Sequence, residues 1–186
     1  WISSDSENIL KSVKNNKINL HFRDASIARD NSPVSDTIIA ILKKYKKNNL
    51  PEAIMLLQPT SPIREKKHID DAISLLKKNK KMNSLISVCG MNDVHPARMY
   101  WEKNKELKSI LDEHEQKHRQ DLPIAYYRNG AIYLVRTQAF LSTKSLMAKP
   151  AMPFKMSENL LLNIDSERDL LIAESIITSW KKGTLK

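Results

Sequence analysis

The chain has 186 residues, of which 41% are hydrophobic and 28% are charged, and its net charge is +10; this composition is typical of one folded domain in water. No apolar run approaches the ~20 residues of a membrane-spanning helix and no signal peptide is recognisable, so we predict a cytoplasmic protein without membrane contact. The lone Cys89 excludes an internal disulfide, and the paired lysines fall at predicted helix ends without interleaved aromatic residues, so nucleic acid is not the expected partner.

Strand-like and helix-like segments alternate through the first half of the chain. The chain begins within a strand, and Ser4 or Asp5 caps a helix that we expect to run to about Asn15. Apolar runs predict further strands at 18–22, 53–57 and 84–88, and helical periodicity predicts helices that begin at Ser32-Pro33 and that cover 69–76. This alternation predicts an α/β fold in which crossover helices flank a mostly parallel sheet.

The pattern changes after Gly90. Residues 93–127 are polar and rich in Lys, Glu and His, with a single strong apolar group at 99–101, so we interpret them as an inserted arm. Regular structure returns with a strand at 131–135, where Asn129-Gly130 by itself predicts a turn. A final helix is predicted over 167–181, capped by Ser166. Cys89 lies in an apolar run, which favours a buried strand position over a nucleophile.

Residues 56–64, which read LLQPTSPIR, are the most informative stretch of the sequence. An apolar strand stops there at a polar loop with two prolines. In open α/β sheets, ligands bind outside the carboxyl ends of the strands. Gln58, Thr60, Ser61 and Arg64 are therefore where a substrate would bind, although the local pattern alone leaves a plain proline-rich connection open.

Four stretches together resemble the motifs of the acylneuraminate cytidylyltransferases, the CMP-sialic acid synthetases. In chain order they are ISSDSENI at 2–9, LLQPTSPIR at 56–64, RQDLP at 119–123 with NGAIY at 129–133, and NIDSERDL at 163–170. The resemblance spans almost the whole chain. It implies a Rossmann-like fold of the nucleotide-diphospho-sugar transferase type, one domain over 1–186, and an arm at 93–127 that exchanges contacts with a second subunit in a homodimer.

The resemblance also implies a reaction. An enzyme of this family couples CTP to a sialic-acid-like nonulosonate and releases pyrophosphate, with Mg²⁺ as its cofactor. Family members often carry Asp at both positions that correspond to Asn163 and Asp165, and Mg²⁺ prefers oxygen ligands. We therefore expect Asp165 to be the main metal ligand and Asn163 to help weakly, since in an extended segment both face one side. Without the resemblance, Asp165 would simply stabilise the start of the following helix, and Asp169 is expected to be structural.

The remaining site residues are carried over from the same family. Gln58 is expected to act in catalysis by binding the sugar or positioning its hydroxyl. The nucleotide would contact Arg23, Thr60 and Ser61, and the sugar would contact Gln58, Arg98, Arg119, Asn129 and Tyr133. Taken alone, Arg98 and Arg119 are more typical of solvated surface charges.

One motif of the family has no counterpart in the chain. A glycine-rich, basic loop that holds phosphates through backbone N–H groups is not found among the three scattered glycines. We therefore predict a chain that is truncated at its N-terminus and turns over little CTP by itself. The alternatives are a non-catalytic relative that serves as a sugar-binding or assembly partner, which Asn163 and the missing loop favour, and a basic nucleic-acid-binding module.

Overall fold

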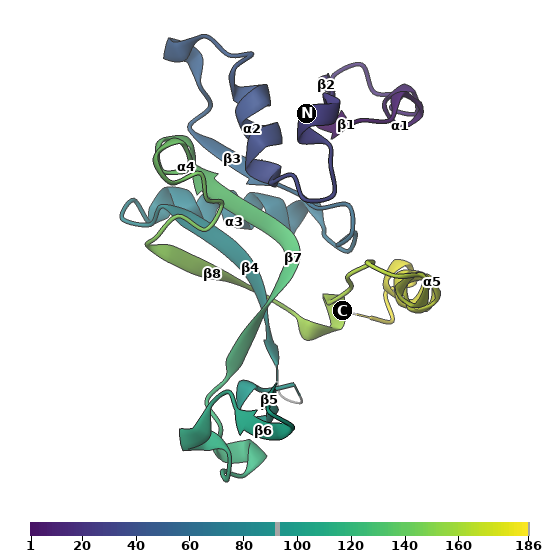
Figure 1. Cartoon of the computed structure of the whole chain (residues 1–186). Helices are drawn as coiled ribbons and strands as arrows, with labels where there is room; N and C mark the ends of the chain where they lie inside the picture. Colours follow the sequence, from purple (N-terminus) through teal and green to yellow (C-terminus); the bar gives the residue numbers. More distant parts are fainter. Residues whose placement is uncertain (92–93, 186) are drawn as a thin grey trace. The chain divides into compact units, whose positions relative to one another are not determined.

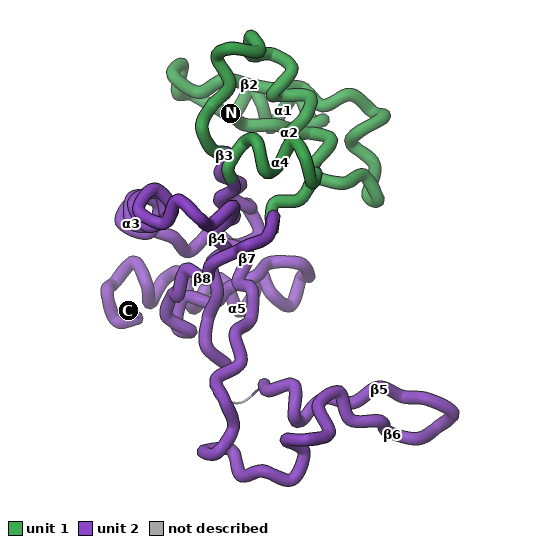
Figure 2. The backbone as a smooth tube through the Cα atoms, turned by 90° about the vertical axis from the view of Figure 1, so that its left-hand side faces the viewer, with its two compact units in different colours: residues 1–53, 136–146 green, residues 54–135, 147–186 purple. Residues whose placement is uncertain are grey.

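The computed structural model describes residues 1–91 and 94–185, which form two compact units (Figure 2). Unit 1 comprises residues 1–53 and 136–146, and unit 2 comprises residues 54–135 and 147–186. Residues 136–146 thus belong to unit 1 although the residues on both sides of them in the chain belong to unit 2.

Unit 1 begins with a small parallel sheet. Strand β1 (Ile2–Ser4) pairs with β2 (Leu20–Phe22), and helix α1 (Glu7–Lys11) connects them. The helix predicted here is therefore too long. The observed helix is capped by Ser6, one to two residues after the predicted cap, and it ends well before Asn15. Residues 14–17 read KNNK, and asparagine disfavours the helix interior, which explains the early end.

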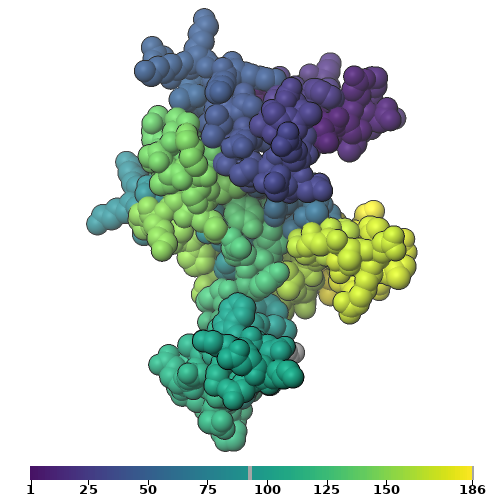
Figure 3. Space-filling view, viewed as in Figure 1, coloured from purple at the N-terminus to yellow at the C-terminus, as the bar shows by residue number. Residues whose placement is uncertain are grey.

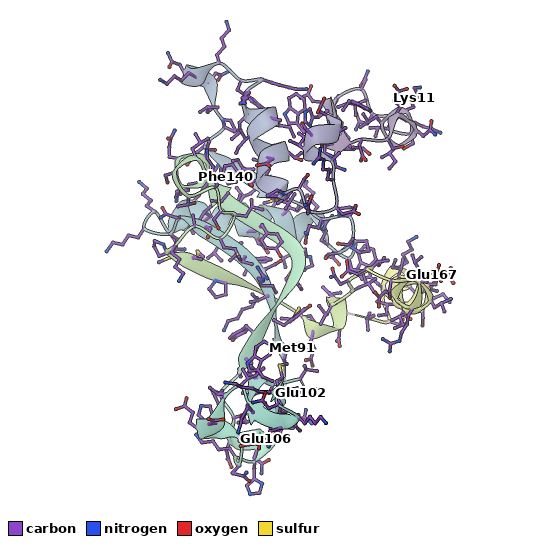
Figure 4. All side chains as sticks on the ribbon, viewed as in Figure 1. Lys11, Met91, Glu102, Glu106, Phe140 and Glu167 are labelled. Atoms are coloured by element: carbon purple, nitrogen blue, oxygen red, sulfur yellow. The ribbon has the colours of Figure 1, made fainter. Side chains whose placement is uncertain are left out.

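Two further helices belong to unit 1. Helix α2 (Val34–Leu42) begins one residue later than predicted, because Pro33 is its N-cap in extended conformation rather than its first helical residue, and it buries Thr37, Ile38 and Leu42. Helix α4 (Thr137–Thr143) was not predicted, because seven residues rich in Thr and Ser carry little helical periodicity. Its Phe140, labelled in Figure 4, is fully buried.

The sheet of unit 2 has the strand order β3–β7–β4–β8 (Figure 1). Its strands are β3 (Ala53–Leu56), β4 (Ser84–Met91), β7 (Ala125–Arg136) and β8 (Ala151–Met156), and α3 (Lys66–Lys78) lies between β3 and β4 in the chain. Strand β4 is parallel to β8 but antiparallel to β7. The prediction of a mostly parallel sheet is therefore wrong at β7. No crossover helix lies in the described part of the chain between β4 and β7, and strands joined in this way pair antiparallel.

Strand β8 was also missed in the sequence. Pro153 lies inside it, and proline cannot donate a hydrogen bond to a neighbouring strand. The strand order explains why proline is tolerated, since β8 is an edge strand whose one sheet neighbour is β4.

Residues 94–124 follow β4 and precede β7 in the chain, and the last partners of these two strands are Met91 and Ala125. Figure 3 shows the segment in teal to green at the bottom of the view, and Figure 4 labels its Glu102 and Glu106. The segment contains the hairpin β5 (Tyr100–Lys103) and β6 (Glu106–Ser109), joined by Asn104 and Lys105 at positive φ, as a tight hairpin turn requires. The last three residues of the predicted arm at 93–127 therefore belong to β7. Asp93 lies outside the described residues.

Short 3₁₀ turns complete the chain between the larger elements, at Ala25–Ile27, Lys47–Asn49, Pro96–Arg98, Asp112–His114, Arg119–Asp121 and Glu158–Leu160.

The last helix, α5 (Glu167–Lys181), confirms the predicted bounds and the predicted cap at Ser166. Ser166 and Asp169 exchange hydrogen bonds with each other's backbone, which forms a capping box. Among the helices that the structure describes, none is long and apolar enough to cross a membrane.

Candidate functional site

A large bulge interrupts the pairing of β4 with β7. Ile86 pairs with Tyr133 and Val88 pairs with Arg128, so Ser87 alone faces residues 129–132. Gly130 adopts φ +74°, a conformation that side chains disfavour. The predicted Asn129-Gly130 turn is therefore a bulge inside a continuous strand. Such bulges re-aim side chains and are frequent beside functional sites.

Asn129 holds this bulge together from within the sheet. Its side chain is 3% exposed. Its Oδ1 accepts from the Ser87 hydroxyl at 2.5 Å and from the Ala131 N–H at 3.2 Å. Its Nδ2 lies 3.4 Å from the sulfurs of Cys89 and of Met156. The amide of Asn129 is thus engaged by the protein, and its direct contact with a sugar stays a prediction.

Cys89 is buried, as predicted. Burial raises the pKa of its thiol, an effect that the hydrogen bond with Asn129 partly offsets and the negative charge of Glu158 reinforces. A thiol with a raised pKa is a poor nucleophile at neutral pH.

Arg64 fastens the 58–64 loop to the bulge. Its guanidinium donates to the backbone oxygens of Ser61 at 2.7 Å, Gln58 at 3.0 Å and Ala131 at 3.1 Å. Partial burial among these carbonyls lowers the pKa of Arg64. The sequence predicts Arg64 to lie where a substrate would bind. In the structure, its guanidinium N–H groups instead donate to backbone oxygens and fix the loop.

The segment that precedes α5 joins the same place. The Ile164 N–H donates to the Thr60 oxygen at 2.8 Å. The Ser61 hydroxyl, 2% exposed, lies 2.8 Å from Asn163 Oδ1 and 3.0 Å from the Asn129 backbone oxygen. Asn163 Nδ2 in turn donates to Asp165 Oδ2 at 2.6 Å. The structure therefore brings together four residues predicted for the site, Ser61, Asn129, Asn163 and Asp165, and we call them, with Gly130, the Ser61 cluster.

The absence of a side chain at Gly130 allows Ser61, Gln58 and Asn163 to pack close to the backbone of the bulge. A Cβ at this position would overlap the Ser61 hydroxyl and would lie 3.0 Å from Gln58 Oε1 and 3.4 Å from Asn163 Oδ1. Sequence reasoning missed this role, because the Asn-Gly pair predicts only a turn. The same geometry shows that the Gln58 side chain faces the cluster. No hydrogen bond to its amide is recorded among the described residues, so its donor and acceptor are available to a ligand.

Asp169 is structural, as predicted. Its Oδ2 accepts from the N–H of Asp165 at 3.1 Å, from the N–H of Ser166 at 2.9 Å and from the Ser166 hydroxyl at 2.8 Å. These hydrogen bonds, led by that of the Ser166 hydroxyl, lower the pKa of Asp169. Its carboxylate is thus committed to the cap of α5.

The donors around Asp165 fit Mg²⁺ in one particular way. Asp165 is exposed and has one carboxylate oxygen free of its bond with Asn163. Within residues 1–91 and 94–185, no group of three or more acidic, His or Cys side chains could hold a metal. Mg²⁺ is commonly held by one or two carboxylates plus substrate phosphates and water. The residues therefore fit a cation that arrives with a phosphate ligand.

Unit 1 contains a separate hollow of about 340 Å³, which we call the Arg23 hollow. It is lined by Asp5, Phe22, Arg23, Ala25, Ala28 and Arg29. Arg23 Nη2 donates to Asp5 Oδ1 at 2.9 Å, while its Nε is buried without a recorded partner in the described chain. A hydrogen bond from the backbone of Asp5 and another from Arg23 lower the pKa of Asp5. With two arginines and one aspartate, the hollow suits an anionic ligand.

The predicted sugar-binding residues of the 94–124 segment have local partners. Arg98 donates to the backbone oxygens of Glu115 and Lys117, both at 2.6 Å. His95 is 4% exposed, with Nε2 2.8 Å from the Pro123 oxygen, and its Nδ1 accepts from the Ala97 N–H. Arg119 lies at the surface of the same segment. Tyr133 lies half-buried on β7. Contacts of Arg98, Arg119 and Tyr133 with a sugar stay predictions.

Comparison with known proteins agrees with the motifs. A family model described as Cytidylyltransferase matches residues 1–174. The N-acylneuraminate cytidylyltransferase of Escherichia coli O18:K1:H7 is 30% identical over 129 residues, which cover 67% of this chain and 30% of the relative. The N-acylneuraminate cytidylyltransferase of Streptococcus agalactiae serotype III is 24% identical over 172 residues, covering 92% of this chain and 40% of the relative.

A third relative carries a different sugar in its name. The CMP-N,N'-diacetyllegionaminic acid synthase of Legionella pneumophila is 28% identical over 161 residues, covering 83% of this chain and 67% of the relative. The chain thus spans less than half the length of the first two relatives and about two thirds of this one.

Proposed function

The chain belongs to the cytidylyltransferase family, and from this premise we propose that it activates a sialic-acid-like nonulosonate with CTP. The products would be a CMP-sugar and pyrophosphate. The names of the relatives favour this class of sugar, since two are N-acylneuraminate cytidylyltransferases and one makes a CMP-activated legionaminic acid.

The Ser61 cluster is the observation that carries this proposal. Three stretches that resemble the family's motifs meet there through hydrogen bonds, although Ser61 is 68 residues from Asn129 and 102 residues from Asn163 in the chain. Residues so distant converge only if the fold gathers them. Two of these stretches follow the carboxyl ends of β3 and β8, which is a typical place for a substrate in an α/β protein.

The proposed reaction is a displacement at the α-phosphorus of CTP. An oxygen of the sugar hydroxyl forms a bond to phosphorus, the bond to pyrophosphate breaks, and the hydroxyl proton is released. Gln58 would orient the attacking hydroxyl, because its amide faces the cluster with donor and acceptor unengaged. When bound, Mg²⁺ would neutralise the phosphate charges, with Asp165 as its protein ligand. The Asn163 oxygen, predicted as a weaker second ligand, faces the Ser61 hydroxyl in this structure.

We propose Arg23 as a contact for the nucleotide phosphates. The buried Nε of Arg23 is a donor without a recorded partner in the described chain, and phosphate oxygens would satisfy it. Thr60 and Ser61 would complete the nucleotide contacts. For the sugar we propose Gln58, Arg98, Arg119, Asn129 and Tyr133. The arm at 93–127 would form a homodimer, which its exposed Trp101 and Leu107 favour.

Calorimetry and pyrophosphate release test the proposal together. We expect the chain to bind CTP more tightly than ATP, GTP or UTP in the presence of Mg²⁺. Pyrophosphate release should require a nonulosonate such as N-acetylneuraminate or legionaminate. Replacing Asp165 by Asn should lower CTP-dependent turnover at least about tenfold, whereas Asp71→Asn, an exposed change on α3, should leave it unchanged. Equal binding of all four nucleotides would refute the assignment.

A non-catalytic, sugar-binding role is the second candidate. The bond from Asn163 Nδ2 to Asp165 favours it, because an amide donor occupies a carboxylate oxygen that a metal could use. This role predicts that calorimetry detects a nonulosonate bound without CTP, and that no pyrophosphate forms under any condition.

A further inference from the structure

The amide of Asn163 has a defined orientation. Its nitrogen faces the Asp165 carboxylate at 2.6 Å and its oxygen faces the Ser61 hydroxyl at 2.8 Å. The reverse orientation would place an amide oxygen against a carboxylate oxygen with no hydrogen between them. A carboxylate only accepts and an amide nitrogen only donates, so the hydrogen bonds fix which end of the amide faces which partner.

This orientation leaves both ends of Asn163 satisfied by protein groups. The Ser61 hydroxyl, its partner on one side, is almost completely buried, and Arg64 fixes the loop that carries it by donating to the Ser61 backbone oxygen. The Asp165 carboxylate, its partner on the other side, is exposed and would otherwise turn freely. Asn163 therefore ties an exposed carboxylate to a buried hydroxyl.

We propose that Asn163 is a positioning residue for Asp165, which keeps the Ser61 cluster complete without a cation and makes the chain bind a divalent cation only together with nucleotide phosphate. The inference deepens the proposed function, and only its clause about nucleotide rests on that function. A carboxylate at position 163 could not act in this way, because it has no donor for Asp165 and would repel it.

Thermal unfolding of variants in EDTA and in Mn²⁺ tests the positioning role. In EDTA, Asn163→Asp should lower the melting temperature by several degrees, because two carboxylates then face each other without a donor. Mn²⁺ alone should restore most of this loss. The wild-type melting temperature should not respond to Mn²⁺ alone but should rise with Mn²⁺ and CTP together. Asn48→Asp, the same change at an exposed position in unit 1, should do none of this.

Binding of Mn²⁺ without nucleotide, followed by electron paramagnetic resonance, is the direct measurement. We expect Asn163→Asp to bind Mn²⁺ at least about tenfold more tightly than the wild type, because it adds a second carboxylate ligand. The inference is overturned if the wild type binds Mn²⁺ alone as tightly as this variant does. It is also overturned if the variant melts in EDTA at the wild-type temperature.

A second variant separates lost hydrogen bonds from added charge. Asn163→Ala removes both bonds of the amide and adds no carboxylate, so it should melt lower than the wild type in EDTA and should gain nothing from Mn²⁺ alone. Rescue of the alanine variant by Mn²⁺ would contradict the proposal. If neither variant folds, the wild-type Mn²⁺ measurement still decides it. The measurements made without CTP remain valid even if the chain binds no nucleotide, so failure of the proposed function is distinguished from failure of this inference.

Discussion

The Ser61 cluster and the Arg23 hollow differ in whether their buried polar groups have hydrogen-bond partners within the protein. In the cluster, the Ser61 hydroxyl, the Asn129 amide and the Asn163 amide are all bonded to protein groups, and Arg64 fixes the loop that carries Ser61. In the hollow, a buried arginine nitrogen has no recorded partner within the described residues. The first is built before a ligand arrives, and we propose that a ligand completes the second. We therefore expect changes in the cluster to cost stability first and changes in the hollow to cost affinity first.

The largest effect is expected at Gly130. Gly130→Ala should lower the free energy of unfolding by about 2–4 kcal/mol, because a side chain is strained at positive φ and the new Cβ would overlap the Ser61 hydroxyl. Urea unfolding measures the change.

Gly183→Ala is a matched control for this substitution. Gly183 has a similar φ of +70°, but nothing lies within 4 Å of a Cβ there. The control should cost about 1 kcal/mol from backbone strain alone. If the two variants lose equal stability, the close approach at Gly130 contributes nothing and the cluster is less tightly built than we infer.

A smaller loss is expected at Arg64. Arg64→Met should lower the free energy of unfolding by about 2 kcal/mol, because it leaves backbone oxygens of the loop and the bulge without their donors. Arg64→Lys should recover part of this, since an ammonium cannot reproduce the planar fork. Arg168→Met, at an exposed site on α5, should stay within about 0.5 kcal/mol of wild type. A loss as large at Arg168 would mean that Arg64 acts only through its charge.

The same contrast explains what could be read from the sequence. Helix α5 was predicted with its bounds, because its cap and its apolar periodicity are signals within one segment. The 58–64 loop was recognised because its motif is contiguous. The bulge was not, because it depends on Ser87, which lies on another strand and accepts the Ile132 N–H at 2.7 Å. Gly130 and Arg64 derive their roles from such distant partners, so no local pattern carries them.

The Arg23 hollow should respond in affinity rather than in stability. Arg23→Gln should weaken CTP binding about tenfold, because a charge-assisted donor to phosphate is lost. The free energy of unfolding should change little, since the pair with Asp5 is partly exposed. Calorimetry and urea unfolding of one preparation give both values. A variant that loses stability but binds CTP normally would reverse the comparison between the two regions.

The smallest expected effect is in the acid titration of two aspartates, one from each region. The pKa of Asp5 and the pKa of Asp169 are both lowered in the folded chain. A group with a lowered folded pKa binds fewer protons than in the unfolded chain, so the stability it contributes is present above its unfolded pKa and is lost as the pH falls through its folded pKa. Both contributions should therefore be complete at neutral pH and should disappear below about pH 4.

Arg23→Gln separates the two aspartates. In this variant the pKa of Asp5 should rise only part of the way to its ordinary value, because the hydrogen bond from its own backbone, the larger cause, remains. The pKa of Asp169 should not move, because the Ser166 hydroxyl and neighbouring backbone N–H groups set it. Carboxyl chemical shifts followed by NMR across the acid range report both residues. A shift of the Asp169 titration in this variant would show that the charge of the hollow is felt in the capping box beside the Ser61 cluster, and that the two regions are not electrostatically independent.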